Sequence, residues 1–465
     1  MKIAVHGLGY IGLPTAALFA QSGLDVVGVD ISPAVTEAIR RGAPETREPD
    51  VAKLIERVVA RGRLRVASSP EPANTHILCL PTPVDTQKRP LLHHIDAALF
   101  AVAPHLREGD LIIIESTVPP GTTEMLAHKI AKLRPDLPNE SIFLAHCPER
   151  AIPGAALREI AENERIIGGL CPTASEMAAA LYRRISRARL NITDARTAEL
   201  CKLAENAWRD ATIAFANELS LICQELGADV WRLINLANRH PRVAIPRPGP
   251  GVGGHCLAVD PWFLVDAAPG CTEFIQAARQ RNDAMPSQTA DRIEKVLAHL
   301  SRPARIACFG LSYKPDTDDL RESPALAIAK ILADRGHEVL AVEPHIDVLP
   351  LGLVSSGARL VSCTTALKDA DAVGILVAHR AFAERRTEIA RHPVVVDAVG
   401  LLSGAFGDGP SIDEAGRRVE NDNIALVEPA QDFGVNTVAV ADLDRCEMRD
   451  PVRNPEDRPN AVLTE

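Results

Sequence analysis

A single cysteine stands in a loop of unusual composition between residues 247 and 263, RPGPGVGGHCLAVDPWF. Four glycines and two prolines precede Cys256 in this loop. Glycine permits close approaches of the backbone that other residues resist, so the loop is suited to presenting a thiol in a confined place. The ten cysteines of the chain include no C-x-x-C pair, so the pattern indicates neither a disulfide framework nor a metal site and is typical of reduced thiols in the cytosol. Cys256 is therefore a candidate nucleophile.

A second group that can do chemistry lies on a long predicted helix. The segment from about residue 195, DARTAELCKLAENAWRDATIAFANELSLICQELG, has helical periodicity and stops at Gly227. Lys202 and Asn206 are four residues apart, so an ammonium and an amide share one helix face and both point toward a polarised oxygen. The alternative is a solvated stripe, which most Lys–Asn pairs form. A helix of this length can also join two domains and build a subunit interface.

The N-terminal 30 residues predict a strand, a glycine turn, a helix and a second strand that ends at Asp30. Gly7, Gly9 and Gly12 form a G-x-G-x-x-G motif at the junction of strand and helix, where the backbone can approach a pyrophosphate. Asp30 is positioned to bind a ribose diol and to repel a 2′-phosphate, which favours NAD over NADP. The alternative is a glycine turn that serves only helix–strand packing.

Two further strands run into polar loops that contain proline, at THILCLPTPVD and DLIIIESTVPPGTT. Parallel strands deliver such loops to one edge of a sheet, so Thr82, Ser116 and Thr117 are candidates for the cofactor-binding edge. The alternative is that these hydroxyl groups cap the helices that follow.

A second strand–turn–helix–strand unit begins near residue 300, and ADAVGILVAH and HPVVVDA are later strands. Its first turn carries Lys314 and Arg321, which can hold phosphate charge. The alternative is a surface salt-bridge network with the acidic residues Asp316, Asp318, Asp319 and Glu322. The sequence thus predicts an α/β protein with two Rossmann-like domains, joined by a helical central domain with a long connecting helix.

Length and composition agree with a soluble enzyme. The 465 residues predict about three domains, and 46% hydrophobic with 24% charged residues is ordinary for globular proteins. The net charge of −10 has no long basic run, so we expect no nucleic-acid partner. Neither a signal peptide nor an apolar run of membrane-spanning length is evident, so we expect a cytoplasmic protein without a membrane partner.

Seven motifs occur in the same order as in a known protein family, over roughly residues 1 to 405. They are GLGYIGLPTA, LPTPVD, ESTVPPGTT, CPER, ELCKLAENAWRD, PGPGVGGHC and GLSYKPDTDDLRESP. The chain resembles the UDP-glucose/GDP-mannose dehydrogenase family. This resemblance implies oxidation of a sugar C6 alcohol to a carboxylate in two hydride transfers to NAD, in polysaccharide biosynthesis. It implies that Cys256 forms a thiohemiacetal and then a thioester, and that a homodimer or higher homo-oligomer forms.

The resemblance also implies individual roles. Lys202 and Asn206 match the pair that stabilises charge on oxygen, Thr117 and Glu149 match residues that hold or activate water, and Asp260 matches a residue that assists proton transfer. Asp260 followed by Pro261 also predicts a helix N-cap. We further expect cofactor contacts from Tyr10, Ile11 and Arg321, and substrate contacts from Glu149, Arg150, Lys202, Asn206, Arg242, Gly253 and Lys314. Lys202 is expected to help the thiol to ionise.

The expected substrate follows from CPERAIPG, in which Pro153 stands where the UDP-glucose pattern has a second glutamate. The motifs are most similar to the UDP-N-acetylmannosamine branch, with UDP-N-acetylglucosamine and UDP-glucose as alternatives. A non-catalytic NAD- or nucleotide-sugar-binding regulator and a two-electron hydroxyacid dehydrogenase remain alternatives of other classes. The expected domains are an NAD-binding domain (1–195), a central and dimerisation domain with the Cys256 loop (196–298), a UDP-sugar-binding domain (299–405) and a partly mobile extension (406–465).

Overall fold

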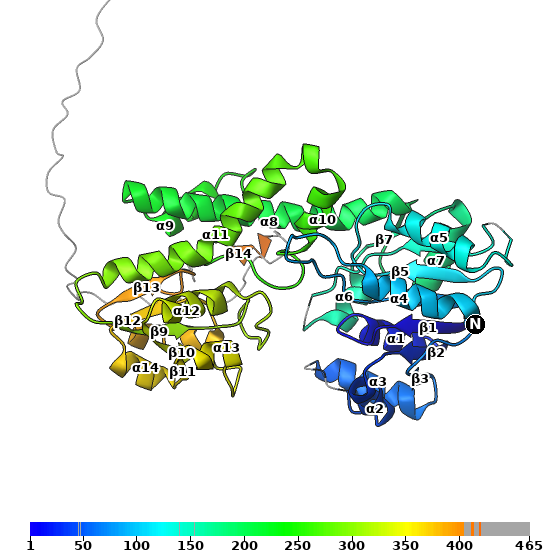
Figure 1. Ribbon diagram of the computed structural model, residues 1–465, viewed down its shortest axis with the longest axis horizontal. Coiled ribbons are helices and arrows are strands. Elements are labelled where there is room, and N and C mark those ends of the chain that lie inside the picture. The colour runs from blue at the N-terminus through cyan, green and yellow to red at the C-terminus, as the bar shows by residue number, and fades with distance from the viewer. Residues whose placement is uncertain are drawn as a thin grey trace, which may run out of the picture. The chain divides into compact units, whose positions relative to one another are not determined.

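The protein, described here by a computed structural model, has the predicted α/β architecture with two parallel-sheet units and a long connecting helix (Figure 1). The structure describes residues 1–44, 46, 48–138, 140–152, 154–403, 411–412 and 418–419. Pro153 and nearly all of the 406–465 extension therefore lie outside the described residues. No helix among the described residues is long and apolar enough to cross a membrane.

An eight-stranded sheet forms the N-terminal unit. Its strand order is β3-β2-β1-β4-β5-β6-β7-β8, and every pair is parallel except β6 with β7. The first six strands have the order of a dinucleotide-binding Rossmann sheet. The strands are β1 (Lys2–His6), β2 (Asp25–Val29), β3 (Leu64–Ala67), β4 (Thr75–Leu78), β5 (Leu111–Ile114), β6 (Phe143–His146), β7 (Arg165–Gly169) and β8 (Leu190–Asp194).

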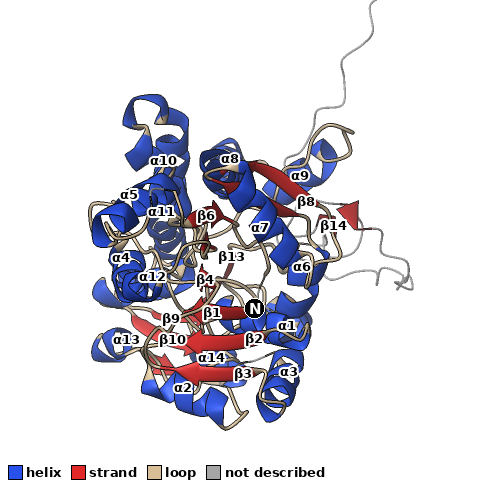
Figure 2. Ribbon diagram, turned by 90° about the vertical axis from the view of Figure 1, so that its right-hand side faces the viewer, coloured by secondary structure: helices blue, strands red, loops and turns tan. Residues whose placement is uncertain are grey.

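Helices pack on this sheet because its central strands are buried along almost their whole length and must be covered on both faces. Figure 2 shows α1 and α3 beside strands β1 to β3, in agreement with their contacts. The helices of this unit are α1 (Gly12–Gln21), α2 (Pro33–Arg40), α3 (Pro49–Ala60), α4 (His93–Val102), α5 (Thr122–Leu133), α6 (Ala156–Glu162) and α7 (Pro172–Tyr182), with a short 3₁₀ turn η1 at Ala103–His105.

The long helix α8 spans Ala195–Leu226, as its periodicity predicts. Asp194 caps it by accepting the Thr197 N–H at 2.8 Å, and Gly227 ends it in the left-handed conformation at φ 69°. Helix α8 contacts β7, α10 and α11, so it links the N-terminal sheet to the helical segment that follows. That segment contains α9 (Val230–Ala237), α10 (Asp260–Ala267), the 3₁₀ turn η2 (Pro269–Cys271) and α11 (Glu273–Val296).

A five-stranded parallel sheet of order β11-β10-β9-β12-β13 forms the last unit. Its strands are β9 (Arg305–Phe309), β10 (Glu338–Val342), β11 (Arg359–Leu360), β12 (Ala372–Ile375) and β13 (Val395–Asp397). Its helices are α12 (Pro324–Asp334), α13 (Leu351–Ser355), α14 (Cys363–Asp369), α15 (Arg380–Ala383) and α16 (Arg386–Ile389). The two-residue strands β14 (Ser411–Ile412) and β15 (Arg418–Val419) pair with each other beyond it.

Candidate active site

The turn after β1 holds three glycines, of which packing requires two. A Cβ atom would lie 2.3 Å from the Cys79 carbonyl oxygen at Gly7 and 1.9 Å from the Gly7 carbonyl oxygen at Gly12. A Cβ at Gly9 would meet nothing within 4 Å. Packing thus explains Gly7 and Gly12 but not Gly9, which leaves room beside the N-terminus of α1. Unpaired N–H groups there favour an anion, so the turn fits the pyrophosphate of a dinucleotide.

Asp30 follows β2 and lies beside the same turn. One carboxylate oxygen accepts the Leu8 N–H at 2.8 Å, and the other accepts the Ser32 N–H at 2.9 Å. These two hydrogen bonds fix the carboxylate relative to the glycine turn. An acidic side chain held here is suited to accept hydrogen bonds from a ribose diol.

The loops after β4 and β5 are joined through hydroxyl groups. Ser116 Oγ accepts the Leu80 N–H at 2.7 Å and donates to the last carbonyl of β4 at 3.2 Å, while Thr82 Oγ1 donates to the Thr117 carbonyl oxygen at 2.7 Å. Helix α5 is capped by Gly121, not by Ser116, so the capping alternative is wrong for Ser116. Both hydroxyl groups shape the edge of the sheet by connecting its loops.

Close packing against the loop after β9 explains two of the four glycines of the cysteine loop, Gly253 and Gly254. The Gly254 N–H donates to the Arg321 carbonyl oxygen at 3.2 Å, and a Cβ at Gly253 would lie 2.4 Å from the Glu322 carbonyl oxygen. Gly254 also has φ +82°, which disfavours residues with a side chain. The thiol of Cys256 is thereby held between α8 and the C-terminal sheet unit.

Opposing effects set the charge state of Cys256. Burial and the Asp260 carboxylate raise the pKa of the thiol to about 11, although Lys202, Arg209 and Arg321 lower it. Lys202 acts in the expected direction, but the two opposing effects are larger. Lys202 thus helps the thiol to ionise, as expected, but does not ionise it alone, so the thiol needs a proton acceptor.

Asp260 supplies a buried carboxylate next to this thiol. It is 3% exposed, and burial raises its pKa to about 6 although Lys202 and Asn206 lower it. Asn206 Nδ2 donates to Asp260 Oδ2 at 2.5 Å. The predicted N-cap role is wrong, because α10 has Val259 at its N-cap and the Asp260 side chain turns inward to Asn206. A buried carboxylate needs such a partner to offset the loss of hydration.

We expect Asp260→Asn to make Cys256 easier to ionise. The substitution removes a charge that raises the thiol pKa, whereas Lys202→Met removes one that lowers it. The pH midpoint for alkylation of Cys256 by iodoacetamide should thus fall in the first variant and rise in the second. Mass spectrometry of the Cys256 peptide measures this, with the exposed Cys271 as internal control. Shifts of the opposite sign would contradict the assignment.

Glu149 lies at the edge of the site with its carboxylate fully engaged. One oxygen accepts the Arg150 and Ala151 N–H groups at 2.7 and 2.9 Å, and the other forms an ion pair with Arg165. Glu149 is only 9% exposed. Its oxygens are therefore fixed acceptors, which suits holding a water molecule more than moving to abstract a proton.

A buried network behind Glu149 was not predicted from the sequence. Arg165 also pairs with Glu115 at 3.1 Å, and its guanidinium lies 4.3 Å over the Tyr182 ring. Glu115 further accepts the Tyr182 hydroxyl at 2.7 Å and the Cys79 thiol at 2.9 Å. The signal in the sequence is a charged residue directly bordering an apolar strand, as in LIIIES and ERIIGG. This network holds Arg165 in place, and Arg165 in turn holds the Glu149 carboxylate.

His146 was missed as well. It ends β6, is fully buried, and neither ring nitrogen has a hydrogen-bond partner within the described residues. Burial and the charge of Lys202 lower its pKa to about 3, so the ring is neutral. The neutral ring adds no positive charge to that of Lys202.

Three of the basic residues predicted to bind substrate or cofactor have side-chain contacts within the protein. Arg150 pairs with Glu205 at 2.9 Å, and Arg321 pairs with Asp319 at 2.6 Å, so the salt-bridge alternative applies to Arg321. Lys314 Nζ lies 5.8 Å from the ring centre of the neighbouring Tyr313. Lys314 and Arg321 occupy the loop that packs on the cysteine loop.

Three other predicted residues, Tyr10, Ile11 and Arg242, make the following contacts, none of which is with Cys256, Lys202, Asn206 or Asp260. The Tyr10 hydroxyl donates to the Ile152 carbonyl oxygen at 2.6 Å, and Ile11 is the N-cap residue of α1. Arg242 is exposed, and its N–H donates to His240 Nδ1 at 3.3 Å.

Comparison with known proteins gives matches along most of the chain. Three family models of the UDP-glucose/GDP-mannose dehydrogenases match: the NAD binding domain at residues 1–186, the central domain at 196–284 and the UDP binding domain at 307–404. An NDP-N-acetyl-D-galactosaminuronic acid dehydrogenase of Ralstonia nicotianae is 49% identical over 409 residues, which are 86% of this chain and 96% of that protein.

A UDP-N-acetyl-D-mannosamine dehydrogenase of Yersinia pestis is 45% identical over 417 residues, covering 86% of this chain and 98% of that protein. Among solved structures, a UDP-D-ManNAc dehydrogenase of Pyrococcus horikoshii matches with a TM-score of 0.79 at 38% identity. The match covers 87% of this chain and 96% of the Pyrococcus horikoshii chain.

Proposed function

The chain belongs to the UDP-glucose/GDP-mannose dehydrogenase family, and we propose on this premise that it oxidises C6 of UDP-N-acetyl-D-mannosamine to the uronic acid. The observation that carries the proposal is the arrangement of three side chains around one thiol. Cys256 lies within the electrostatic reach of Lys202 and Asp260, and Asn206 is hydrogen bonded to Asp260. A nucleophile, a cation, an amide and a carboxylate of raised pKa are the groups that two successive oxidations at one carbon require.

The cofactor is NAD, which accepts a hydride in each oxidation when bound. The residues present fit it, because the turn at Gly9 is open and the Asp30 carboxylate is held beside that turn. The chain contributes binding and orientation. Tyr10, Ile11, Thr82, Ser116, Thr117 and Arg321 belong to the proposed cofactor contacts.

In the first oxidation, Lys202 and Asn206 stabilise negative charge on the C6 oxygen while its proton leaves and a hydride departs from the carbon. Cys256 then adds to the aldehyde. The S–C bond forms, the thiol proton passes to Asp260, and Asp260 returns it to the aldehyde oxygen to give a thiohemiacetal. Asp260 suits this exchange because its pKa of about 6 leaves it mostly ionised at neutral pH.

Departure of the second hydride and the hydroxyl proton converts the thiohemiacetal into a thioester. Water attacks the thioester carbon, the C–S bond breaks, and the carboxylate leaves with the thiol restored. We propose that Glu149 and Thr117 hold this water. Two NADH form per substrate and one water is consumed.

We propose that the UDP-sugar is held by Lys314, Arg242, Arg150 and the backbone at Gly253. The UDP binding domain of the family matches residues 307–404, which include Lys314. A galacto-configured substrate is the second candidate, because the Ralstonia nicotianae relative at 49% identity is named for N-acetyl-D-galactosaminuronic acid.

Counting NADH per UDP-sugar tests the proposed function. Purified protein with limiting UDP-N-acetyl-D-mannosamine should form two NADH for each sugar, with the uronic acid as product by mass spectrometry. One NADH per sugar would indicate a two-electron dehydrogenase. Binding of NAD and UDP-sugar without NADH formation would indicate a non-catalytic regulator.

Asp30→Ala should reduce the preference for NAD over NADP. The carboxylate is positioned to accept the ribose hydroxyl groups and to repel a 2′-phosphate, so its removal weakens NAD binding and relieves repulsion of NADP. Measuring kcat/KM for both cofactors tests this, with Asp25→Ala at the exposed start of β2 as control. An unchanged ratio in Asp30→Ala would show that the residue does not bind the ribose.

We propose that the protein is a cytoplasmic homodimer or higher homo-oligomer with the domains 1–195, 196–298, 299–405 and 406–465. Trp208, Phe215 and Ile222 recur every seven residues along α8, so they share one face, and Trp208 is 70% exposed. A contiguous exposed apolar face is typical of a subunit interface. Light scattering should give at least twice the chain mass of 50.0 kDa, and Trp208→Arg should lower it.

A further inference from the structure

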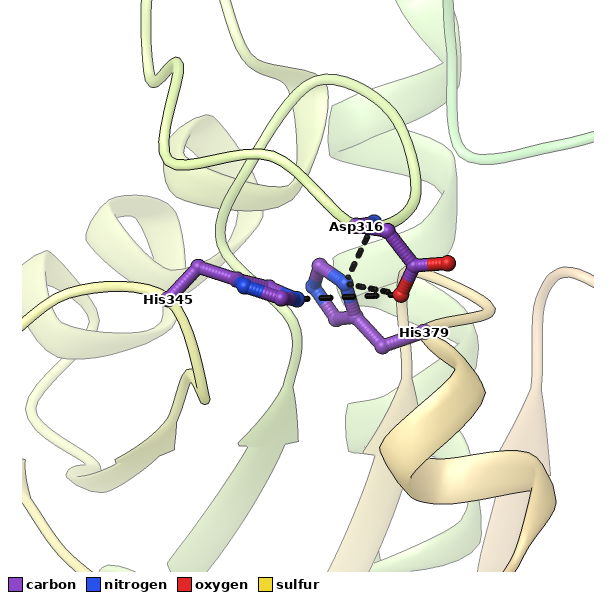
Figure 3. Close-up of side chains that lie close together, drawn as sticks. All are labelled: Asp316, His345 and His379. Carbon is purple, nitrogen blue, oxygen red and sulfur yellow. Dashed lines mark hydrogen bonds and ion pairs between the residues drawn. The ribbon is translucent and has the colours of Figure 1, made fainter. Parts of the chain in front are cut away.

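A cluster of two histidines and an aspartate lies at the carboxyl edge of the C-terminal sheet, and no step of the proposed reaction uses these three side chains. Asp316 is in the loop after β9, His345 follows β10, and His379 precedes α15. Figure 3 shows the two imidazole rings next to each other and tilted, with the Asp316 carboxylate beside both. Three segments of the chain thus bring potential ligand atoms to one point.

The distances suit a common ligand. Asp316 Oδ1 lies 3.7 Å from His345 Nε2 and 3.8 Å from His379 Nδ1, and all three ligand atoms lie within 4.8 Å of one another. Ligand atoms around a tetrahedral zinc ion are about 3.4 Å apart, given bond lengths near 2.0–2.1 Å. Small movements of the loops would therefore bring the three atoms to bonding distance.

Glu343 supports one of these ligands as metal-binding proteins commonly do. His379 is fully buried, and its Nε2 lies 3.1 Å from Glu343 Oε2, while its Nδ1 accepts the Asp316 N–H at 2.9 Å. The proton is accordingly on Nε2 and the lone pair of Nδ1 faces the cluster. A carboxylate behind a histidine fixes the ring and increases its basicity as a ligand.

His345 supplies a further observation. Its Nε2 atom is buried and has no hydrogen-bond partner within the described residues. The backbone N–H of the same residue donates to Glu343 at 3.1 Å, which orients the segment. A buried imidazole nitrogen without a partner is costly unless a ligand occupies it.

Two interactions compete with a metal ion. Asp316 Oδ1 accepts the Arg380 N–H at 3.0 Å, and the Arg380 guanidinium lies 3.9 Å from Asp316 Oδ2. To bind His379 Nδ1, the ion must also displace the Asp316 N–H, which donates a hydrogen bond to that nitrogen. Both effects weaken binding relative to a preformed closed site, but neither blocks His345 Nε2.

We propose that Asp316, His345 and His379 form a binding site for a divalent transition-metal ion such as Zn²⁺, supported by Glu343. Two imidazoles and one carboxylate are a donor set that zinc accepts, with water completing the tetrahedron. The bound ion would connect the loop that carries Lys314 and Arg321 to the ends of β10 and β12. The Gly254 N–H contacts this loop at Arg321, so the ion would stabilise the surface on which the cysteine loop packs.

The test is calorimetric titration of the chelator-treated full chain with ZnCl₂, which does not depend on dehydrogenase activity. The proteins compared are wild type, His345→Ala, Asp316→Asn and the double variant His93→Ala/His94→Ala. The last removes a pair of adjacent histidines elsewhere on the chain, with ring centres 4.0 Å apart, and is the matched control. Thiols that take up zinc are present in all four proteins, so they do not affect the difference.

We expect one equivalent of Zn²⁺ to be lost or bound at least tenfold more weakly in His345→Ala and Asp316→Asn, and to be retained in the control. Zn²⁺ should raise the Tm of the wild type and the control, but not of His345→Ala. His345→Ala should fold, because His345 Nε2 makes no hydrogen bond, and Asp316→Asn keeps an acceptor for the Arg380 N–H. Equal zinc binding by wild type and both variants, or its loss in the control, would overturn the proposal.

Discussion

Cys256→Ser is expected to lower kcat for the complete oxidation by about 10³-fold or more, the scale seen when a covalent nucleophile is removed. A hydroxyl adds to an aldehyde less readily than a thiol and forms an ester in place of a thioester, so the reaction should stall after the first hydride transfer. NADH yield from limiting UDP-sugar, together with mass spectrometry of the protein and the sugar, measures this. Aldehyde or a covalent adduct should accumulate.

The matched control for this variant is Cys271→Ser. Cys271 is an exposed free thiol in the turn η2 of the same helical segment, so the same atom is exchanged away from the charged cluster. It should retain two NADH per sugar and nearly full kcat. If Cys256→Ser also yields two NADH at an undiminished rate, the covalent mechanism is wrong and the thiol only packs the loop.

The parts of the fold that the sequence predicted correctly are those with short-range patterns. The G-x-G-x-x-G spacing marks the turn between β1 and α1, and Gly227 marks the end of α8 by capping chemistry. Such features depend on neighbours a few residues away. The two sheets followed from repeated strand–helix alternation, which is why the fold class could be predicted.

The features that the sequence did not predict depend on burial and on contacts with residues far away in the chain. The direction of the Lys202 effect on Cys256 was predictable, but the larger opposing effect of burial was not, because it depends on how the loop packs. Asp260 has the local signature of an N-cap, yet a tertiary hydrogen bond to Asn206 turns it inward.

The sequence also did not predict the side-chain clusters whose residues come from separate segments of the chain. Glu115 and Arg165 are 50 residues apart, and their pairing requires β5, β6 and β7 to be adjacent. Asp316, His345 and His379 likewise have no metal-ligand spacing, which is why the sequence predicted no metal. They meet only because parallel strands deliver their loops to the same edge of the sheet.

Discrimination between sugars is the second large effect that we expect. UDP-N-acetyl-D-mannosamine should have the highest kcat/KM, and UDP-glucose should be lower by about 10³-fold or more, because a pocket that hydrogen bonds an acetamido group leaves polar atoms unpaired without it. The argument began with Pro153, which lies outside the described residues, so the test must be kinetic. One assay condition with UDP-N-acetyl-D-mannosamine, UDP-N-acetylglucosamine, UDP-N-acetylgalactosamine and UDP-glucose ranks the candidates.

Two variants test whether Arg150 recognises the acetamido group. Its guanidinium pairs with Glu205 and also donates to the Glu164 carbonyl oxygen. Arg150→Met should lower kcat/KM for the N-acetylated sugars much more than for UDP-glucose, whereas Glu205→Gln removes only the ion pair and should leave the ranking intact. Equal losses for all sugars in Arg150→Met, or the same losses in Glu205→Gln, would mean that Arg150 only supports the loop. UDP-glucose as the best substrate of the wild type would overturn the proposed sugar while leaving the two-step chemistry unaffected.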